Sequence, residues 1–207
     1  MILLTGAAGF IDSVLLGRFA DDGLAGDTVV VDDFSPPAKK RSHAGKTCAE
    51  AVERAALPEW LRGCGDRLHL IVHLGTRTDT MDADRRAFDE LNVRPTKALW
   101  TFAARHGIPL VYASSAAVYG DGRHGFAADH ALTERLRPLN AYGRSKGEID
   151  VWALAQTEAP PYWVGLRFFN VYGPTGRGKR CSSTSRPRRA WRTSRRGSLS
   201  SRSRRRW

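Results

Sequence analysis

Short apolar, β-branched runs alternate along residues 1–174 with longer stretches of helical hydrophobic pattern. The runs predict strands at 2–4, 28–31, 70–73, 110–113 and 163–167, and the stretches between them predict helices at about 12–24, 48–63, 84–106 and 141–158. Segments 36–47 and 120–138 are polar and rich in turn residues, so they are expected to be loops. This alternation is typical of βαβ units. The sequence therefore predicts an α/β protein with a Rossmann-type, doubly wound parallel sheet.

The last 31 residues differ in composition from the rest. Residues 1–176 hold 20 Lys and Arg residues against 21 Asp and Glu residues, whereas 177–207 hold 13 basic residues and no acidic one. The net charge of +12 therefore comes from the tail. From Cys181 onward, ten of 27 residues are Arg and eight are Ser, and such a segment buries too little to offset the entropy of ordering it. We expect one domain at 1–176 and a disordered basic tail at 177–207.

Composition also limits the class of protein. No run of about 18 apolar residues is present, so no membrane-spanning helix is expected. The three cysteines, Cys48, Cys64 and Cys181, lack metal-ligand spacing, and the six histidines show no paired spacing. We therefore expect no metal site, a structural role for His73, and a cytoplasmic chain with reduced thiols.

A glycine-containing loop follows the first expected strand and leads into the first expected helix: Thr5-Gly6-Ala-Ala-Gly9-Phe-Ile-Asp12. Glycines there allow a tight turn and let backbone N–H groups approach a pyrophosphate, which the helix N-terminus also attracts. Asp32 ends the second strand, where a carboxylate can accept hydrogen bonds from an adenosine ribose. This order predicts a dinucleotide site. Asp32 favours NAD, whereas the basic run Lys39-Lys40-Arg41 could receive the 2′-phosphate of NADP, so the choice stays open.

Asp12 opposes this interpretation. It stands where the usual loop has a third glycine, which allows close packing of the helix on the sheet. A carboxylate about 5 Å from the pyrophosphate would repel each charge by roughly 3 kcal/mol at an effective dielectric constant near 20. Such repulsion would weaken binding by about two orders of magnitude.

A second constellation lies in the other half of the chain. Tyr142 and Lys146 are four residues apart at the start of an expected helix, so the phenol and the ammonium share one face. To act at neutral pH the phenol pKa must drop by about 3 units, or roughly 4 kcal/mol, and a neighbouring ammonium acts in that direction. Ser114 and Ser115 end the strand at 110–113, on the edge of the sheet where ligands bind. The combination predicts a Ser–Tyr–Lys site of the oxidoreductase type.

Six segments together resemble the extended short-chain dehydrogenase/reductase superfamily and its NAD-dependent epimerase/dehydratase family: 5–12, Asp32, 72–75, 112–120, 142–146 and 167–174. Within it, 109–120, 138–146 and 165–174 are most similar to the ADP-L-glycero-D-manno-heptose 6-epimerases. The resemblance implies an isomerase with tightly held NADP or NAD that inverts C6 of an ADP-heptose. A hydride would leave C6 and return to the opposite face. It also implies a homo-oligomer and a place in the carbohydrate metabolism of lipopolysaccharide.

The resemblance implies roles for individual residues. Tyr142 would be the acid/base, Lys146 would lower its pKa and anchor the ribose, and Ser115 would bond the sugar oxygen. The residues expected around the cofactor are Gly6, Gly9, Phe10, Ile11, Asp32, Asp33, Lys39, Leu74, Gly75, Asn92 and Lys146. Phe169, Asn170 and Val171 would approach the nicotinamide or the substrate, with Asn170 in the substrate site. Lys179 stands near the spacing of the family's second base, and is either that base or the first charge of the tail.

Members of the family place much of the substrate pocket in a C-terminal third that is not recognisable here. We therefore expect that the C-terminal substrate domain is missing, that the tail arises from a shifted reading frame, and that the chain alone turns over weakly or not at all. Two alternatives remain: another nucleotide-sugar 4-epimerase or dehydratase, and a non-catalytic protein whose Arg/Ser tail binds nucleic acid in a salt-sensitive way. The expected partner is a nucleotide sugar rather than nucleic acid or a membrane.

Overall fold

The computed structural model describes residues 1–43 and 45–173. Its centre is one parallel sheet with the strand order β3-β2-β1-β4-β5-β6. The strands are β1 (Ile2–Thr5), β2 (Thr28–Asp32), β3 (Glu50–Glu53), β4 (Leu70–His73), β5 (Leu110–Ser115) and β6 (Trp163–Phe168). Because β1 lies between β2 and β4, the chain winds outward in both directions from the middle of the sheet. This arrangement confirms the predicted fold and all five predicted strands.

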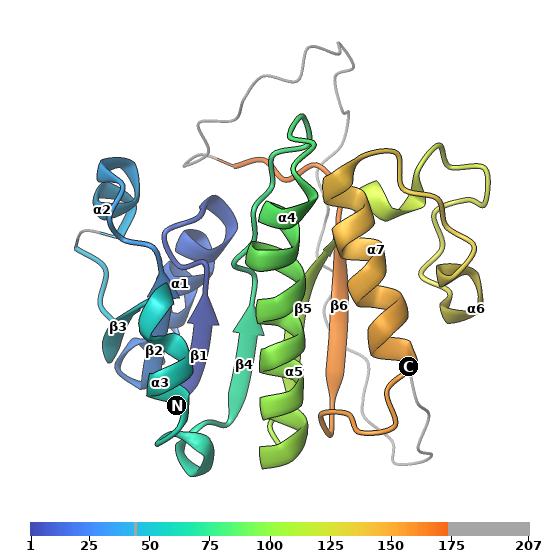
Figure 1. Cartoon of the computed structure of the whole chain (residues 1–207). Coiled ribbons are helices and arrows are strands. Elements are labelled where there is room, and N and C mark those ends of the chain that lie inside the picture. Colours follow the sequence, from blue (N-terminus) through green and yellow to red (C-terminus); the bar gives the residue numbers. More distant parts are fainter. Residues whose placement is uncertain (44, 174–207) are drawn as a thin grey trace, which may run out of the picture. The chain divides into compact units, whose positions relative to one another are not determined.

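Helices connect the strands, as Figure 1 shows. They are α1 (Phe10–Asp21), α2 (Pro37–His43), α3 (Leu57–Leu61), α4 (Arg85–Phe88), α5 (Arg94–His106), α6 (His130–Thr133) and α7 (Ala141–Leu154), with short 3₁₀ turns at Ala25–Asp27, Arg54–Ala56, Gly65–Arg67 and Ala116–Tyr119. A π-helical segment, Asp89–Val93, joins α4 to α5. The predicted helices at 12–24, 84–106 and 141–158 are therefore present, with boundaries shifted by a few residues.

Three segments differ from the prediction. One of them is 120–138, expected to be a loop, which contains the short helix α6. The stretch 48–63, expected to be one helix, contains the edge strand β3 followed by α3. Only Val52 of β3 is buried, so this strand lacks the apolar run that marked the others. The segment 36–47, expected to be a loop, contains α2, which begins at Pro37. A proline is pre-organised for the first turn of a helix, which explains a helix in so polar a segment.

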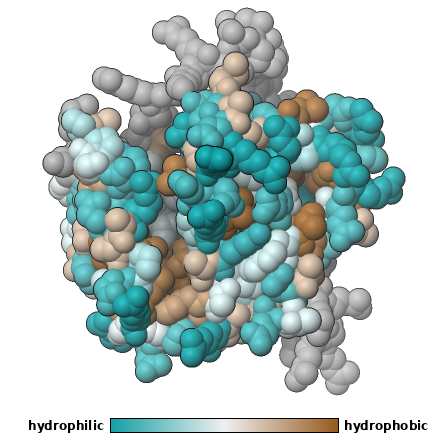
Figure 2. Space-filling model, in the orientation of Figure 1, coloured by the Kyte–Doolittle hydropathy of each residue, from teal (hydrophilic) through white to brown (hydrophobic). Residues whose placement is uncertain are grey.

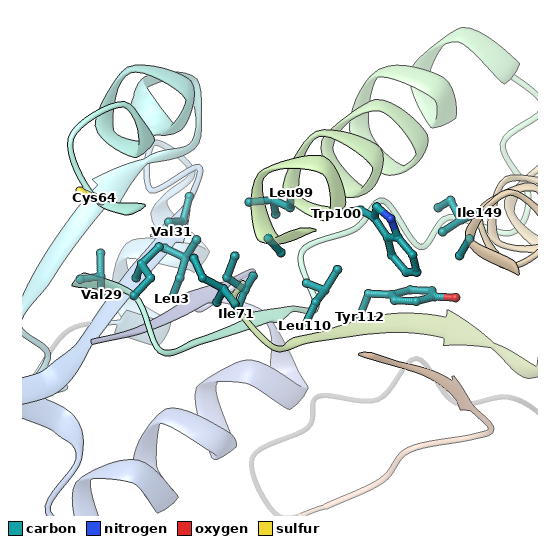
Figure 3. Packing of buried hydrophobic residues seen from close by; sticks show 14 of the residues in the cluster. Leu3, Val29, Val31, Cys64, Ile71, Leu99, Trp100, Leu110, Tyr112 and Ile149 are labelled. Atoms are coloured by element: carbon teal, nitrogen blue, oxygen red, sulfur yellow. The ribbon is translucent and has the colours of Figure 1, made fainter. Parts of the chain in front are cut away.

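Each face of the sheet carries its own core. On one face, strand residues such as Leu3, Ile71 and Leu110 pack against Leu99 and Trp100 of α5, as Figure 3 shows. The opposite core includes Leu4, Val30 and Val72 from the strands and Leu16 of α1. Parallel sheets are normally buried on both faces in this way. The outer surface seen in Figure 2 is mainly hydrophilic, with its hydrophobic residues in smaller separate areas.

The described residues contain no helix long and apolar enough to cross a membrane. The expected domain boundary at 176/177, the basic tail and Lys179 all lie outside the described part of the chain.

Gly120 connects β5 to the loop before α7 under a tight steric constraint. Its φ is 64°, and a Cβ at this position would lie 2.0 Å from the carbonyl oxygen of Arg137. Only a residue without a side chain can allow the two backbone segments to approach so closely. The contact fixes the turn that follows Ser115.

We predict that Gly120→Ala destabilises the fold through this contact, and Gly107→Ala provides the matched control. Gly107 has a φ of 65°, and outside its own chain neighbours and helix no atom of residues 1–43 and 45–173 lies within 4 Å of an added Cβ, so its substitution costs only backbone strain of about 1 kcal/mol. Gly120→Ala should cost roughly 1–3 kcal/mol more. Urea unfolding of both variants measures the difference, and equal losses would contradict the close approach to Arg137.

Candidate active site at the carboxyl edge of the sheet

The carboxyl ends of all six strands border one cleft of about 700 Å³. The side chains and backbone that line it are Gly6, Gly9, Phe10, Ile11, Asp12, Asp32, Lys39, Arg54, Leu74, Gly75, Thr76, Arg77, Thr78, Leu91, Ala113, Ser114, Ser115, Tyr142, Phe168, Phe169 and Val171. Clefts at this edge, where the strand order reverses, are the usual ligand sites of doubly wound sheets. The glycine loop and the Ser–Tyr pair, which are far apart in the sequence, therefore meet in one place.

The glycine loop packs directly on the end of β4. Gly6 has a φ of 85°, and a Cβ there would lie 2.7 Å from the backbone of Gly75. The backbone N–H of Gly6 donates to the carbonyl of Val31 (2.7 Å). Helix α1 starts directly after Gly9, and no side chain caps its first turn. The free N–H groups of that turn can therefore receive an anion.

Asp12 lies inside this loop, and its environment changes its charge. Its side chain is 5% exposed, and Oδ1 has no hydrogen-bond partner among the described residues. Burial, with a smaller contribution from the negative charge of Asp32, raises the pKa of Asp12 to about 8. The carboxyl group is therefore mostly protonated at neutral pH. The repulsion expected from the sequence assumes an ionised Asp12, a form that burial disfavours at neutral pH.

Asp32 lies at the end of β2 with both carboxylate oxygens engaged. Oδ2 accepts the N–H of Ala8 (2.9 Å), Oδ1 accepts the N–H of Asp33 (2.7 Å), and Lys39 forms an ion pair with Oδ1. Asp32 and Lys39 both line the cleft as predicted. The side chains of Lys40 and Arg41 lie outside the described part of the structure.

The Ser–Tyr–Lys residues are positioned by β5 and α7. The side chain of Asn140 caps α7 by accepting the N–H of Gly143 (2.7 Å), and Tyr142 and Lys146 follow on one face of the helix. The Ser115 hydroxyl accepts the N–H of Ala117 (3.1 Å) and lies in the same cleft as Tyr142. Lys146 is 2% exposed, beneath the cleft surface.

Burial dominates the protonation of these groups. It raises the pKa of Tyr142, an effect that the Ser115 hydroxyl partly offsets. It lowers the pKa of Lys146 to about 7, although the charge of Asp150 acts in the opposite direction. The Lys146 ammonium donates to the carbonyl of Ala113 (2.8 Å). In the chain alone, the phenol therefore keeps its proton at neutral pH, and Lys146 is the group that titrates there.

His73 has a structural environment. Its ring nitrogens contact the hydroxyls of Thr5 (2.6 Å) and Thr96 (3.0 Å). Because the Thr96 hydroxyl donates to the carbonyl of Asn92 (2.7 Å), it accepts from Nε2–H, which leaves Nδ1 as an acceptor. Burial and the charge of Lys146 lower the pKa of His73 to about 3, so the ring is neutral.

Four of the predicted site residues do not lie on the cleft surface. Asn92 is fully buried, because its amide bonds the backbone of Arg77 on both sides (2.8 and 3.1 Å). Asp33 accepts hydrogen bonds from Ser35 instead, which lower the pKa of its carboxyl group. Asn170 is exposed outside the lining, although Phe169 and Val171 belong to it. Lys146 is the fourth, because it lies beneath the surface.

Sequence reasoning missed two arginines of the cleft. Arg54 follows β3, so it was lost when that strand was interpreted as a helix. Arg77 follows β4, forms an ion pair with Asp82, and lies over the ring of Phe88 with 5.9 Å to its centroid. Both arginines follow directly or closely on strands at the ligand-binding edge, and that position was the available signal.

The chain is similar to several known proteins. Residues 2–197 match the family described as NAD dependent epimerase/dehydratase. The ADP-L-glycero-D-manno-heptose-6-epimerase of Fusobacterium nucleatum subsp. nucleatum is 36% identical over 178 residues, which cover 84% of this chain and 53% of the relative. The protein of that name from Pseudomonas aeruginosa is 37% identical over 175 residues, covering 84% of this chain and 52% of the relative.

Solved structures show the same similarity. The Helicobacter pylori ADP-L-glycero-D-manno-heptose-6-epimerase superimposes with a TM-score of 0.67 at 30% identity, over 84% of this chain and 56% of that one. The Thermus thermophilus UDP-glucose 4-epimerase complex with NAD gives 0.68 at 25% identity, over 84% and 56%.

The chain spans about half the length of the curated relatives that it matches. The matches confirm the predicted resemblance to heptose 6-epimerases, which are enzymes of a family that uses NAD. Because the family model matches residues 2–197, the chain belongs to the NAD dependent epimerase/dehydratase family.

Proposed function

We propose that this chain binds NAD or NADP in the carboxyl-edge cleft and contributes the acid/base residues of an epimerase that inverts C6 of an ADP-glycero-manno-heptose. The observation that carries the proposal is that Ser115 and Tyr142 line the same cleft as the glycine loop and Asp32. The similarity to named heptose 6-epimerases supports the choice of substrate.

The residues of the cleft fit a dinucleotide at neutral pH. A Cβ on Gly9 would lie 2.9 Å from the backbone carbonyl oxygen of Gly6, so the cradle needs a glycine there. The unpartnered oxygen of Asp12 is unsuitable beside a phosphate if it is ionised, whereas a protonated carboxyl group can donate to one. Asp32 would receive the adenosine ribose, with Lys39 beside it. The first turn of α1 would bind the pyrophosphate.

A bound nicotinamide would take a hydride from C6 of the sugar and return it. The side chains of this chain handle the proton. Tyr142 accepts the proton of the C6 hydroxyl as the C6–H bond breaks, and returns it when the ketone is reduced on its opposite face. Ser115 bonds the same oxygen and orients it. Because burial raises the pKa of Tyr142, its phenol needs a positive neighbour to release the proton, and Lys146 provides one while it is protonated.

One prediction of the proposed function concerns the pH dependence of dinucleotide affinity. If only protonated Asp12 accepts the pyrophosphate, the Kd for NAD or NADP should rise about tenfold between pH 7 and pH 9. With a pKa of about 8, the protonated fraction of Asp12 falls about tenfold over this range. Isothermal titration of the full chain with each dinucleotide measures this. Asp12→Asn should lose the part of the pH dependence that is centred near pH 8, and a pH dependence unchanged in that variant would refute the role of Asp12.

The same variant gives a prediction that needs no ligand. Since the folded-state pKa of Asp12 is raised from 3.8 to about 8, the native chain holds a proton that the unfolded chain has lost. The contribution of this group to stability is present below about pH 4 and is lost as the pH rises toward 8, by up to roughly 1.4 kcal/mol per pH unit. Asp12→Asn should therefore be more stable than the wild type, by more at pH 8 than at pH 5. Urea unfolding at both pH values tests this, and equal differences would contradict a buried neutral carboxyl group.

The third prediction concerns Tyr142. Because the chain spans about half the length of its relatives, turnover is measured in a chimera in which residues 1–173 replace the matching half of the Pseudomonas aeruginosa relative. The chimera should invert C6 of the ADP-heptose, followed by proton NMR, and Tyr142→Phe should slow it by about 10²–10⁴-fold with an unchanged dinucleotide Kd. A phenylalanine variant that keeps the full rate would exclude Tyr142 as the acid/base, and turnover of UDP-hexoses alone would favour a 4-epimerase.

A further inference from the structure

A buried carboxylate lies one helical turn beyond Lys146. Asp150 of α7 is 5% exposed. Its Oδ1 accepts the hydroxyl of Tyr112 (3.0 Å), and its Oδ2 accepts the hydroxyl of Ser114 (2.9 Å) and Nε of Arg167 (3.0 Å). Three donors on two different strands therefore converge on one side chain that sequence reasoning did not select.

The surroundings of Asp150 form an ordered, hydrogen-bonded network rather than a chance contact. A buried charge is tolerated only when it is paired and its oxygens are hydrogen-bonded. The Arg167 and Asp150 side chains are 12% and 6% exposed. Arg167 is itself fixed, because it donates to the Thr133 hydroxyl (3.0 Å) and lies over the Tyr119 ring with 5.1 Å to its centroid. In Figure 3, Tyr112 lies at one end of the apolar cluster with its hydroxyl pointing away from it.

The hydrogen-bond network around Asp150 adjoins two residues proposed to act in the reaction, Ser115 and Lys146. Ser114 directly precedes Ser115 on β5, and successive side chains of a strand point to opposite faces of the sheet. Because the Ser114 hydroxyl is bound to Asp150, the Ser115 side chain faces away from Asp150. On α7, Asp150 follows Lys146 by four residues, which places the two side chains on one face of the helix.

The charges that face Lys146 come from several elements. Its own helix presents Tyr142 and Asp150, β4 presents the neutral ring of His73, and β5 presents the carbonyl of Ala113. The cation of Arg167 on β6 is paired with Asp150. Among these groups, Asp150 carries the negative charge that favours an ammonium at Lys146.

We propose that Asp150 is a positioning residue that favours the ammonium form of Lys146 and ties the helix carrying Tyr142 and Lys146 to the ends of β5 and β6. The effect of Asp150 on catalysis rests on the proposed function, because a neutral Lys146 could not stabilise the ionised form of Tyr142. Its effect on the protonation of Lys146 does not. The negative charge of Asp150 raises the pKa of Lys146, against the larger effect of burial, and this supports the proposal.

The test follows Lys146 itself in the full chain without dinucleotide. The chain has six lysines, so ¹³C NMR of lysines labelled at Cε resolves few signals, and Lys146→Arg identifies the signal of Lys146. The wild type should titrate near pH 7. Asp150→Asn, which keeps an acceptor but removes the charge, should lower the midpoint by about one unit, a tenfold loss in proton affinity.

Glu148→Gln is the matched control, since it also removes one negative charge from α7. Glu148 pairs with Lys97 (3.0 Å) on the outside of the helix, so the midpoint of Lys146 should not move. Arg167→Gln is the second variant and keeps the test decisive if Asp150→Asn does not fold. Removing the cation that competes for Asp150 should raise the midpoint of Lys146, and a merely structural role would not produce opposite shifts.

Midpoints that stay at the wild-type value in both Asp150→Asn and Arg167→Gln would overturn the proposal. Dinucleotide binding is measured on the same samples. A chain that binds neither NAD nor NADP would refute the proposed function, while the two NMR shifts would still decide the role of Asp150.

Discussion

The parallel pairing of β1 with both β2 and β4 is the constraint on which the site depends. It sets Thr5 beside Val31 on one side and beside His73 on the other, so the segments that follow these strands emerge at one edge. The crossovers then diverge to the two sides of β1, which leaves the edge open above it. The glycine loop can close on the end of β4 only because Gly6 and Gly75 carry no side chains. The cleft is therefore a direct result of strand order.

Burial then sets the charges around this cleft more strongly than contacts between charges do. Removal from water acts in opposite directions on acids and bases. It makes the carboxyl group of Asp12 and the ring of His73 neutral near pH 7, and brings Lys146 close to its midpoint. The Tyr142 phenol becomes harder to ionise for the same reason. A positive charge near the phenol must therefore be maintained by a partner, and the position of Asp150 next to Lys146 on α7 provides one.

The fold and the ends of its strands could be predicted because both are local in sequence. Apolar runs marked β1, β2, β4, β5 and β6, and residues at or just after the ends of those strands, such as Leu74 and Ser115, line the cleft. Strand β3 was missed because a polar edge strand buries almost nothing. The buried position of Asn92 could not be predicted, because its amide bonds the backbone of Arg77, 15 residues away. Such pairings depend on how α4 and α5 pack, which no hydrophobic period encodes. The proton on Asp12 could not be predicted either, since it depends on burial.

The two buried aspartates show why burial alone does not determine a role. Asp150 has a guanidinium and two hydroxyls on its oxygens, so its charge is compensated within the fold. Asp12 has an oxygen that lacks any partner in the described part of the chain, and its charge has been removed by protonation instead. A neutral carboxyl group costs far less to bury than a carboxylate. A residue that opposes phosphate binding when ionised can thus occupy the position of a glycine in this loop, provided that the loop around it stays dry.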